Sequence, residues 1–69
     1  MEIYEVNSSR CKAAAYTEDG MIIVYNNDKK YLYPTITKHQ FNDFLSSESK
    51  GRWIQENIVS KKLKYKKYG

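Results

Sequence analysis

Three short apolar segments, with turns at residues 17–20 and 26–29, most constrain the fold of this chain. The segments span residues 10–17, 21–25 and 30–33. The second, MIIVY, is the strongest strand candidate because it is rich in β-branched residues. In the first turn, Asp19 and Gly20 supply the backbone angles that a hairpin needs. Pro34 ends the last segment because it cannot donate to a strand ladder. The spacing therefore predicts an antiparallel meander.

Residues 10–17 alternate with the period of two that a strand shows. We expect the inner face of this strand to carry the small residues Cys11, Ala13 and Ala15. Its outer face then carries Arg10, Lys12, Ala14 and Tyr16. Because three alanines are consecutive, a helix is the alternative. Two further segments are ambiguous: residues 3–6 fit an edge strand or an arm, and residues 61–68 fit a short final strand or a frayed end.

A capping box predicts where the first helix begins. Thr37 is a good N-cap, and Gln40, three residues later, can reach back to it. Ile36 before the cap and Phe41 after it fit a hydrophobic staple. We expect the helix over residues 38–46, with an apolar stripe made of Phe41, Phe44 and Leu45.

Ser49 can cap a second helix, expected over residues 50–58, with Trp53 and Ile54 pointing inward. Together these segments predict an α+β fold. Its antiparallel sheet has three or four strands, and two short helices cover one face of that sheet.

The small size and the few Cys and His residues restrict the class of protein. Sixty-nine residues make one domain, 1–69, with a Lys-rich end over residues 60–69. One Cys excludes an internal disulfide and fits a reducing cytoplasm, and one His excludes a multi-His metal site. No apolar run approaches the ~20 residues of a membrane span. The first ten residues lack the basic-then-apolar order of a signal peptide. We therefore expect a cytoplasmic protein that has no metal, cofactor or membrane partner.

Positive charge is concentrated in the last twenty residues. Residues 1–49 hold five basic and seven acidic side chains, a net −2, whereas residues 50–69 hold seven basic side chains against Glu56 alone, a net +6. This asymmetry favours a polyanionic partner, and a solubilising tail is an equally good alternative. The basic tail consists of Lys61, Lys62, Lys64, Lys66 and Lys67.

The order of several motifs resembles that of a known family. VNSS precedes a strand that ends in Tyr16, MIIVY and KYLYP follow, and SKGRWI opens the second helix before Ile58. This order is similar to that of the KTSC domain, named for its occurrence at the C-terminus of some lysyl-tRNA synthetases and also found alone in bacterial and phage proteins. Two departures are Gln55, where the family resemblance leads us to expect Asn, and the Lys-rich region after Ile58. The resemblance implies an α+β fold and a small accessory or binding role, and it implies no reaction.

The second helix start is a candidate anion site. The first N–H groups of a helix have no intrahelical partner, and phosphates bind there. In the stretch Ser49, Lys50, Gly51 and Arg52, glycine exposes backbone between two cations. The hydroxyls of Ser8 and Ser9 and the side chain of Arg10 would complete the site if the start of the first strand lies nearby. The alternative is a tight corner in which Ser49 only caps the helix, Gly51 permits close packing and the cations are solvated.

Aromatic side chains could add stacking contacts to this site. Tyr16, Tyr33 and Trp53 are the candidates, and their alternative is a place in the core. His39 and Asp43 more simply form a surface helix pair, and Cys11 a small buried hydrophobe. Because no nucleophile, base and orienting group come together, we expect no enzyme.

These observations predict a non-enzymatic binding module for a phosphate-bearing ligand. The ligand is RNA, including tRNA, or a nucleotide, which the protein could sequester. The expected source is a phage or a bacterium. The alternative is a protein–protein module, such as a phage inhibitor of a host enzyme, and self-association is left open.

Overall fold

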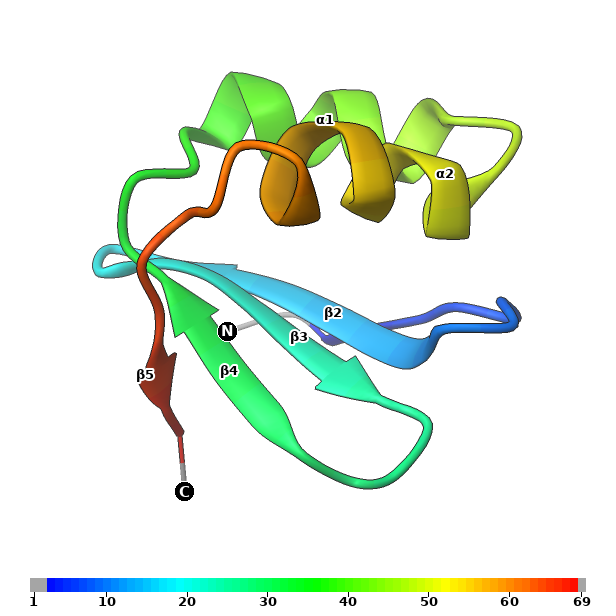
Figure 1. The fold of residues 1–69 in the computed structure, drawn as a ribbon, viewed down its shortest axis with the longest axis horizontal. Helices are drawn as coiled ribbons and strands as arrows, with labels where there is room; N and C mark the ends of the chain where they lie inside the picture. Colours follow the sequence, from blue (N-terminus) through cyan, green and yellow to red (C-terminus); the bar gives the residue numbers. More distant parts are fainter. Residues whose placement is uncertain (1–2, 69) are drawn as a thin grey trace.

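The computed structural model describes residues 3–68 and contains one sheet under a layer of helices (Figure 1). The strands are β1 (Ile3–Glu5), β2 (Cys11–Thr17), β3 (Gly20–Tyr25), β4 (Lys30–Tyr33) and β5 (Lys66–Lys67). The helices are α1 (Lys38–Ser46) and α2 (Lys50–Ile54), and α2 continues as a π-helical segment, η1 (Gln55–Val59).

The sheet is an antiparallel meander with the strand order β1-β2-β3-β4-β5. This confirms the α+β class and the antiparallel sheet. The predicted number of strands, three or four, is wrong because the described residues form five. The two ambiguous segments both pair with the meander, β1 at one edge and β5 at the other. These edge strands have only three and two residues, too few for a period of two to show in the sequence.

A β-bulge at Lys12 changes the faces predicted for β2. Cys11 pairs with Tyr25 while Ala13 pairs with Val24, so Lys12 is the extra residue. The bulge reverses the alternation after Cys11, and Ala14, rather than Ala13 or Ala15, joins Cys11 in the core under the helices. The prediction of the inner face was therefore right for Cys11. It was wrong for Ala13 and Ala15, which lie on the other face, and for Ala14, which it placed outside.

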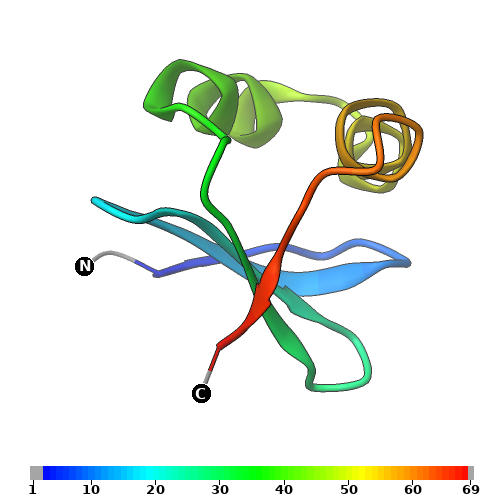
Figure 2. The same cartoon turned by 60° about the vertical axis from the view of Figure 1, so that its left-hand side comes forward.

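Both helices lie on the same side of the sheet, as predicted (Figures 1 and 2). The capping box of α1 is present: the Gln40 amide donates to Thr37 Oγ1 over 3.2 Å, and the Thr37 amide donates to Gln40 Oε1 over 2.8 Å. The second helix begins at Lys50, as expected, and the π-helical turn carries it on to Val59. No helix within residues 3–68 combines the length and apolar character needed to cross a membrane.

Phe44 and Trp53 join the two helices over the sheet. Their rings meet edge to face with centroids 5.2 Å apart, and the Trp53 indole N–H donates to Asp43 Oδ2 over 2.9 Å. Phe44 is fully buried and Trp53 nearly so. The cluster around them draws residues from β2, β3, β4, both helices and η1, and these include Cys11, Met21, Ile23, Tyr33, Phe41, Ile54 and Ile58.

Phe44→Ala should lower the free energy of unfolding by roughly 3–5 kcal/mol, because it leaves a cavity in the centre of this core. In a domain this small, such a loss can unfold most molecules. Chemical denaturation followed by Trp53 fluorescence measures it. Asn42→Ala, on the exposed side of α1, is the control and should change stability by less than about 0.5 kcal/mol. If Phe44→Ala unfolds like the parent, this core assignment is wrong.

Candidate phosphate-binding site

The start of α2 lies against the loop that connects β1 to β2 (Figure 1). A Cβ placed on Gly51 would stand 3.6 Å from Ser8 Oγ and 3.7 Å from Ser9 Oγ and from Arg10 Cγ. The bare backbone of Gly51 therefore faces two hydroxyls and the stem of a cation. The structure thus brings together four of the residues predicted for the anion site, although about forty positions separate Gly51 from the others.

Hydrogen bonds fix the shape of this loop. The Arg10 amide donates to Ser8 Oγ over 3.2 Å. Asn26, in the turn between β3 and β4, donates its side-chain amide to the Ser8 carbonyl and its backbone amide to the Arg10 carbonyl, each over 3.1 Å. The loop is thus tied to the sheet on one side and touches α2 on the other. This gives the serine hydroxyls a defined place without a ligand.

Arg10 is held by the second helix. Its Nη2 donates to Gln55 Oε1 over 2.9 Å, and its stem passes beside Gly51. Gln55 stands four residues after Gly51, so the two lie on the same face of the helix. A guanidinium has five N–H donors. The contact with Gln55 therefore orients the Arg10 side chain and uses only one of its donors. The remaining donors can bind an anion through two hydrogen bonds.

A shallow cavity of about 370 Å³ adjoins Arg10, and it is lined by Arg10, Tyr25, Asn26, Asn27 and Tyr31. The rings of Tyr25 and Tyr31 meet edge to face, 5.6 Å apart. The Tyr25 hydroxyl is 2.7 Å from that of Tyr33, and burial raises the pKa of both phenols. Both therefore stay neutral at physiological pH. The cavity offers an aromatic wall and two amide side chains beside a cation.

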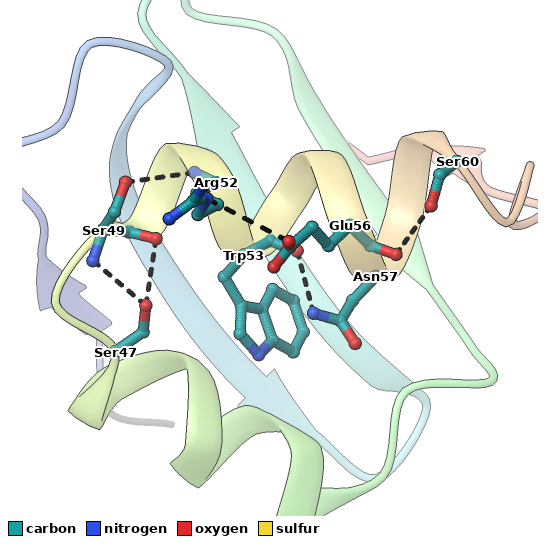
Figure 3. A network of polar contacts seen from close by, with 7 residues as sticks. All are labelled: Ser47, Ser49, Arg52, Trp53, Glu56, Asn57 and Ser60. Atoms are coloured by element: carbon teal, nitrogen blue, oxygen red, sulfur yellow. Dashed lines mark hydrogen bonds and ion pairs between the residues drawn. The ribbon is translucent and has the colours of Figure 1, made fainter.

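The other predicted residues of the helix start make local contacts, and Figure 3 shows those of Ser49 and Arg52. Ser49 Oγ accepts from the Arg52 amide over 3.3 Å and so caps α2. The Lys50 ammonium donates to the Ser47 carbonyl over 2.7 Å. Arg52 is largely exposed, and its Nε lies 4.0 Å from Glu56 Oε2. Lys50 and Arg52 flank Gly51 in the sequence, and the contacts of all three residues stay within the second helix and the turn before it.

The predicted aromatic contacts lie outside this site. Tyr33 and Trp53 are 3% and 5% exposed, so they belong to the core rather than to a stacking surface. Tyr16 packs against Phe41 at the other end of β2, roughly 20 Å of extended chain from Arg10. The residues that sequence reasoning left out of the site are Tyr25, Tyr31, Asn26, Asn27 and Gln55. The only available signal was the pair of tyrosines that flank the NND turn.

All five lysines of the basic tail are exposed, whereas Leu63 between them packs against the core. Lys61, Lys62 and Lys64 lie between η1 and β5, whereas Lys66 and Lys67 form β5 itself. Of the two alternatives for this segment, a short strand is therefore correct. Tyr65, just before β5, places its ring 4.6 Å from that of Tyr31. The tail thus extends the aromatic surface beside Tyr31.

The model of the KTSC domain family matches residues 7–62, most of the chain. The chain belongs to the KTSC domain family. The solved structures include a similar one, the crystal structure of the KTSC domain protein YPO2434 from Yersinia pestis. It matches with a TM-score of 0.81 and 26% sequence identity, over 99% of this chain and 97% of that chain. A search of the curated proteins found no match.

Two motifs that led to the KTSC resemblance are in contact in the structure. The Ser-Ser element before β2 meets the Ser-x-Gly element of α2 at Gly51. Gln55, noted above as a departure, is the residue that holds the Arg10 side chain. In this KTSC domain, the recognisable sequence elements therefore lie where the candidate site lies.

Cys11 should behave as a buried hydrophobe rather than a nucleophile. It is fully buried, and burial raises the pKa of its thiol, although the nearby Lys50 charge acts in the opposite direction. The thiol therefore stays protonated at neutral pH. We expect iodoacetamide to alkylate Cys11 far more slowly in the native protein than in guanidinium chloride, as mass spectrometry would measure. Equal rates in the two conditions would contradict the burial of Cys11.

Proposed function

We propose that this KTSC domain is a non-enzymatic binding module for a phosphate-bearing ligand, and that the ligand is a nucleotide. We expect it to act as a bacterial or phage accessory protein in the cytoplasm. The observation that carries the proposal is the bare backbone of Gly51 opposite the hydroxyls of Ser8 and Ser9.

Packing alone does not require glycine at position 51. The Cβ of an alanine would make ordinary van der Waals contacts of 3.6–3.7 Å, and the nearest atoms belong to the β1–β2 loop rather than to another helix. In a helix, alanine is more favourable than glycine by about 1 kcal/mol. A glycine that costs stability and avoids no clash is typical of a place that a ligand approaches closely. An added methyl group would be in van der Waals contact with both hydroxyls.

The groups around that space suit a phosphate. Serine hydroxyls donate to phosphate oxygens, and arginine adds charge with paired donors. Lys50 and Arg52 raise the local positive potential, with Glu56 as the nearby acid. We infer that Ser8, Ser9 and Arg10 contact the phosphate directly, and that the two cations of the helix start contribute at longer range.

The adjoining cavity suits the rest of a nucleotide. Arg10 belongs to both parts, so a phosphate beside Gly51 leaves the attached group close to Tyr31, Asn26 and Asn27. A base can stack on a tyrosine ring, and its polar edge can pair with side-chain amides. A ligand that has both a phosphate and a base therefore matches this surface better than inorganic phosphate does.

Arg10→Ala should weaken nucleotide binding by roughly 1.5–3 kcal/mol, about 10- to 100-fold in Kd, because it removes a charged hydrogen bond. Gly51→Ala should also weaken binding while it maintains or raises stability. Arg52→Ala removes the same charge at longer range, so it should weaken binding less than Arg10→Ala does. Calorimetric titration with adenosine monophosphate and with inorganic phosphate measures the affinities, and thermal melts confirm folding. Native mass spectrometry of protein purified from its host would show a retained ligand. If Arg10→Ala and Gly51→Ala bind like the parent, the site is not where we place it.

RNA is the competing ligand, and salt dependence distinguishes it from a nucleotide. A triple variant, with Gln at Lys61, Lys64 and Lys67, leaves the backbone of β5 in place. If the tail contacts single-stranded RNA, the slope of log affinity against log salt should flatten by about 0.7 for each lost contact, about 2 in all. Fluorescence anisotropy with labelled oligouridylate measures the slope. An unchanged slope would mean that these lysines only solvate the chain end.

A further inference from the structure

The face of the sheet away from the helices is apolar along two cross-strand rows. Strand pairing places Ile3, Ala15, Ile22, Leu32 and Lys66 side by side in one row. The second row holds Glu5, Ala13, Val24 and Lys30, and the Tyr68 amide donates to the Lys30 carbonyl at its end. We call these ten residues the open face. The helices cover the opposite face of the sheet (Figure 2).

The open face carries large apolar side chains at its edges. Ile3 on β1 is 65% exposed and Tyr68 after β5 is 43% exposed, whereas Ile22 at the centre is buried. A small apolar depression of about 100 Å³ lies between the edges, lined by Ile3, Ala15, Ile22, Val24 and Tyr68 with Ala14 and the stem of Lys30. A contiguous apolar patch of this kind is typical of an interaction surface.

Charge is distributed unequally across this face. Glu5 stands on the β1 edge, and Lys30 and Lys66 stand on the β4 and β5 edge. A twofold axis parallel to the strands, between two stacked sheets, places β1 of one copy over β4 and β5 of the other. Glu5 of each copy then faces the two lysines of its partner, while the partly exposed Val24 meets its own symmetry mate and Ile22 stays buried beneath this contact. The face is therefore complementary to itself in both charge and apolarity.

We propose that two copies of this chain associate through their open faces and form a symmetric dimer with a stacked pair of sheets. Sheets stack about 10 Å apart with their strands within about 30° of each other, and this arrangement interleaves inward-facing side chains. The helices and the candidate phosphate site then point outward from both sides. The dimer does not depend on the proposed ligand, so a failure of either proposal leaves the other standing.

The size of the open face determines how tightly we expect the two copies to bind. The domain measures only 25 × 22 × 21 Å, and a standard stable interface buries about 800 Å² on each partner. The open face is at the small end of that class. We therefore expect a dimer that dissociates in the micromolar range and is visible in a dilution series.

Sedimentation velocity across a dilution series tests the proposal. The parent should shift from dimer to monomer as the concentration falls. Glu5→Lys alone, and Lys30→Glu with Lys66→Glu, each place like charges opposite one another and should raise the dissociation constant roughly tenfold or more. An equimolar mixture of the two variants restores opposite charges at both contacts, so heterodimers should form. Glu18→Lys, in the β2–β3 turn outside the open face, changes the net charge as much as Glu5→Lys does and should dimerise like the parent.

Three outcomes would overturn this inference. A parent that stays monomeric up to millimolar concentration does not use the open face in this way. A dimer that ignores both charge variants is built on another surface. Two variants that remain monomers when mixed, although their circular dichroism melts match the parent, would refute the proposed twofold arrangement.

Discussion

The contact between Phe44 and Trp53 positions the rest of the helical layer. It locks α1 to α2 edge to face, and the hydrogen bond from Trp53 to Asp43 fixes the orientation of the indole at the join. A domain of this size has one small core, so few other contacts could hold two short helices together. Because Trp53 stands in the first turn of α2, the same contact also sets where Gly51 meets the β1–β2 loop. The candidate site therefore depends on core packing that lies underneath it.

The loop that completes the site depends on the sheet. Asn26, in the β3–β4 turn, holds the Ser8 and Arg10 carbonyls. Next to it, the bulge at Lys12 lets Cys11 turn inward, and Lys12 forms an ion pair with Asp28 of the same turn. This pair lowers the pKa of the Asp28 carboxyl. The β1–β2 loop is thus hydrogen-bonded to the turn between β3 and β4 on one side and contacts α2 on the other.

The two faces of the sheet carry different features. The helix side carries the core and, near the β3–β4 turn, the tyrosines and Arg10 of the candidate site. The open face carries apolar rows flanked by opposite charges. Without a second helical layer, a five-stranded sheet leaves one face to water or to a partner. The proposed ligand site and the proposed dimer surface can coexist because they share no residue.

Sequence alone determined the elements whose signals are local. The turn residues and the β-branched run predicted the central meander, and Thr37 with Gln40 predicted the start of α1, because capping and hairpin geometry depend on neighbouring residues. Tertiary structure decided what depends on distant partners. The bulge at Lys12 reversed the face of Ala13 and Ala15, and two short edge strands appeared only through pairing. Folding brought Ser8, Ser9 and Arg10 to Gly51, added Gln55 and Tyr31 beside them, and buried Tyr33 and Trp53. No local pattern encodes those distances, because they result from how two helices pack across one sheet.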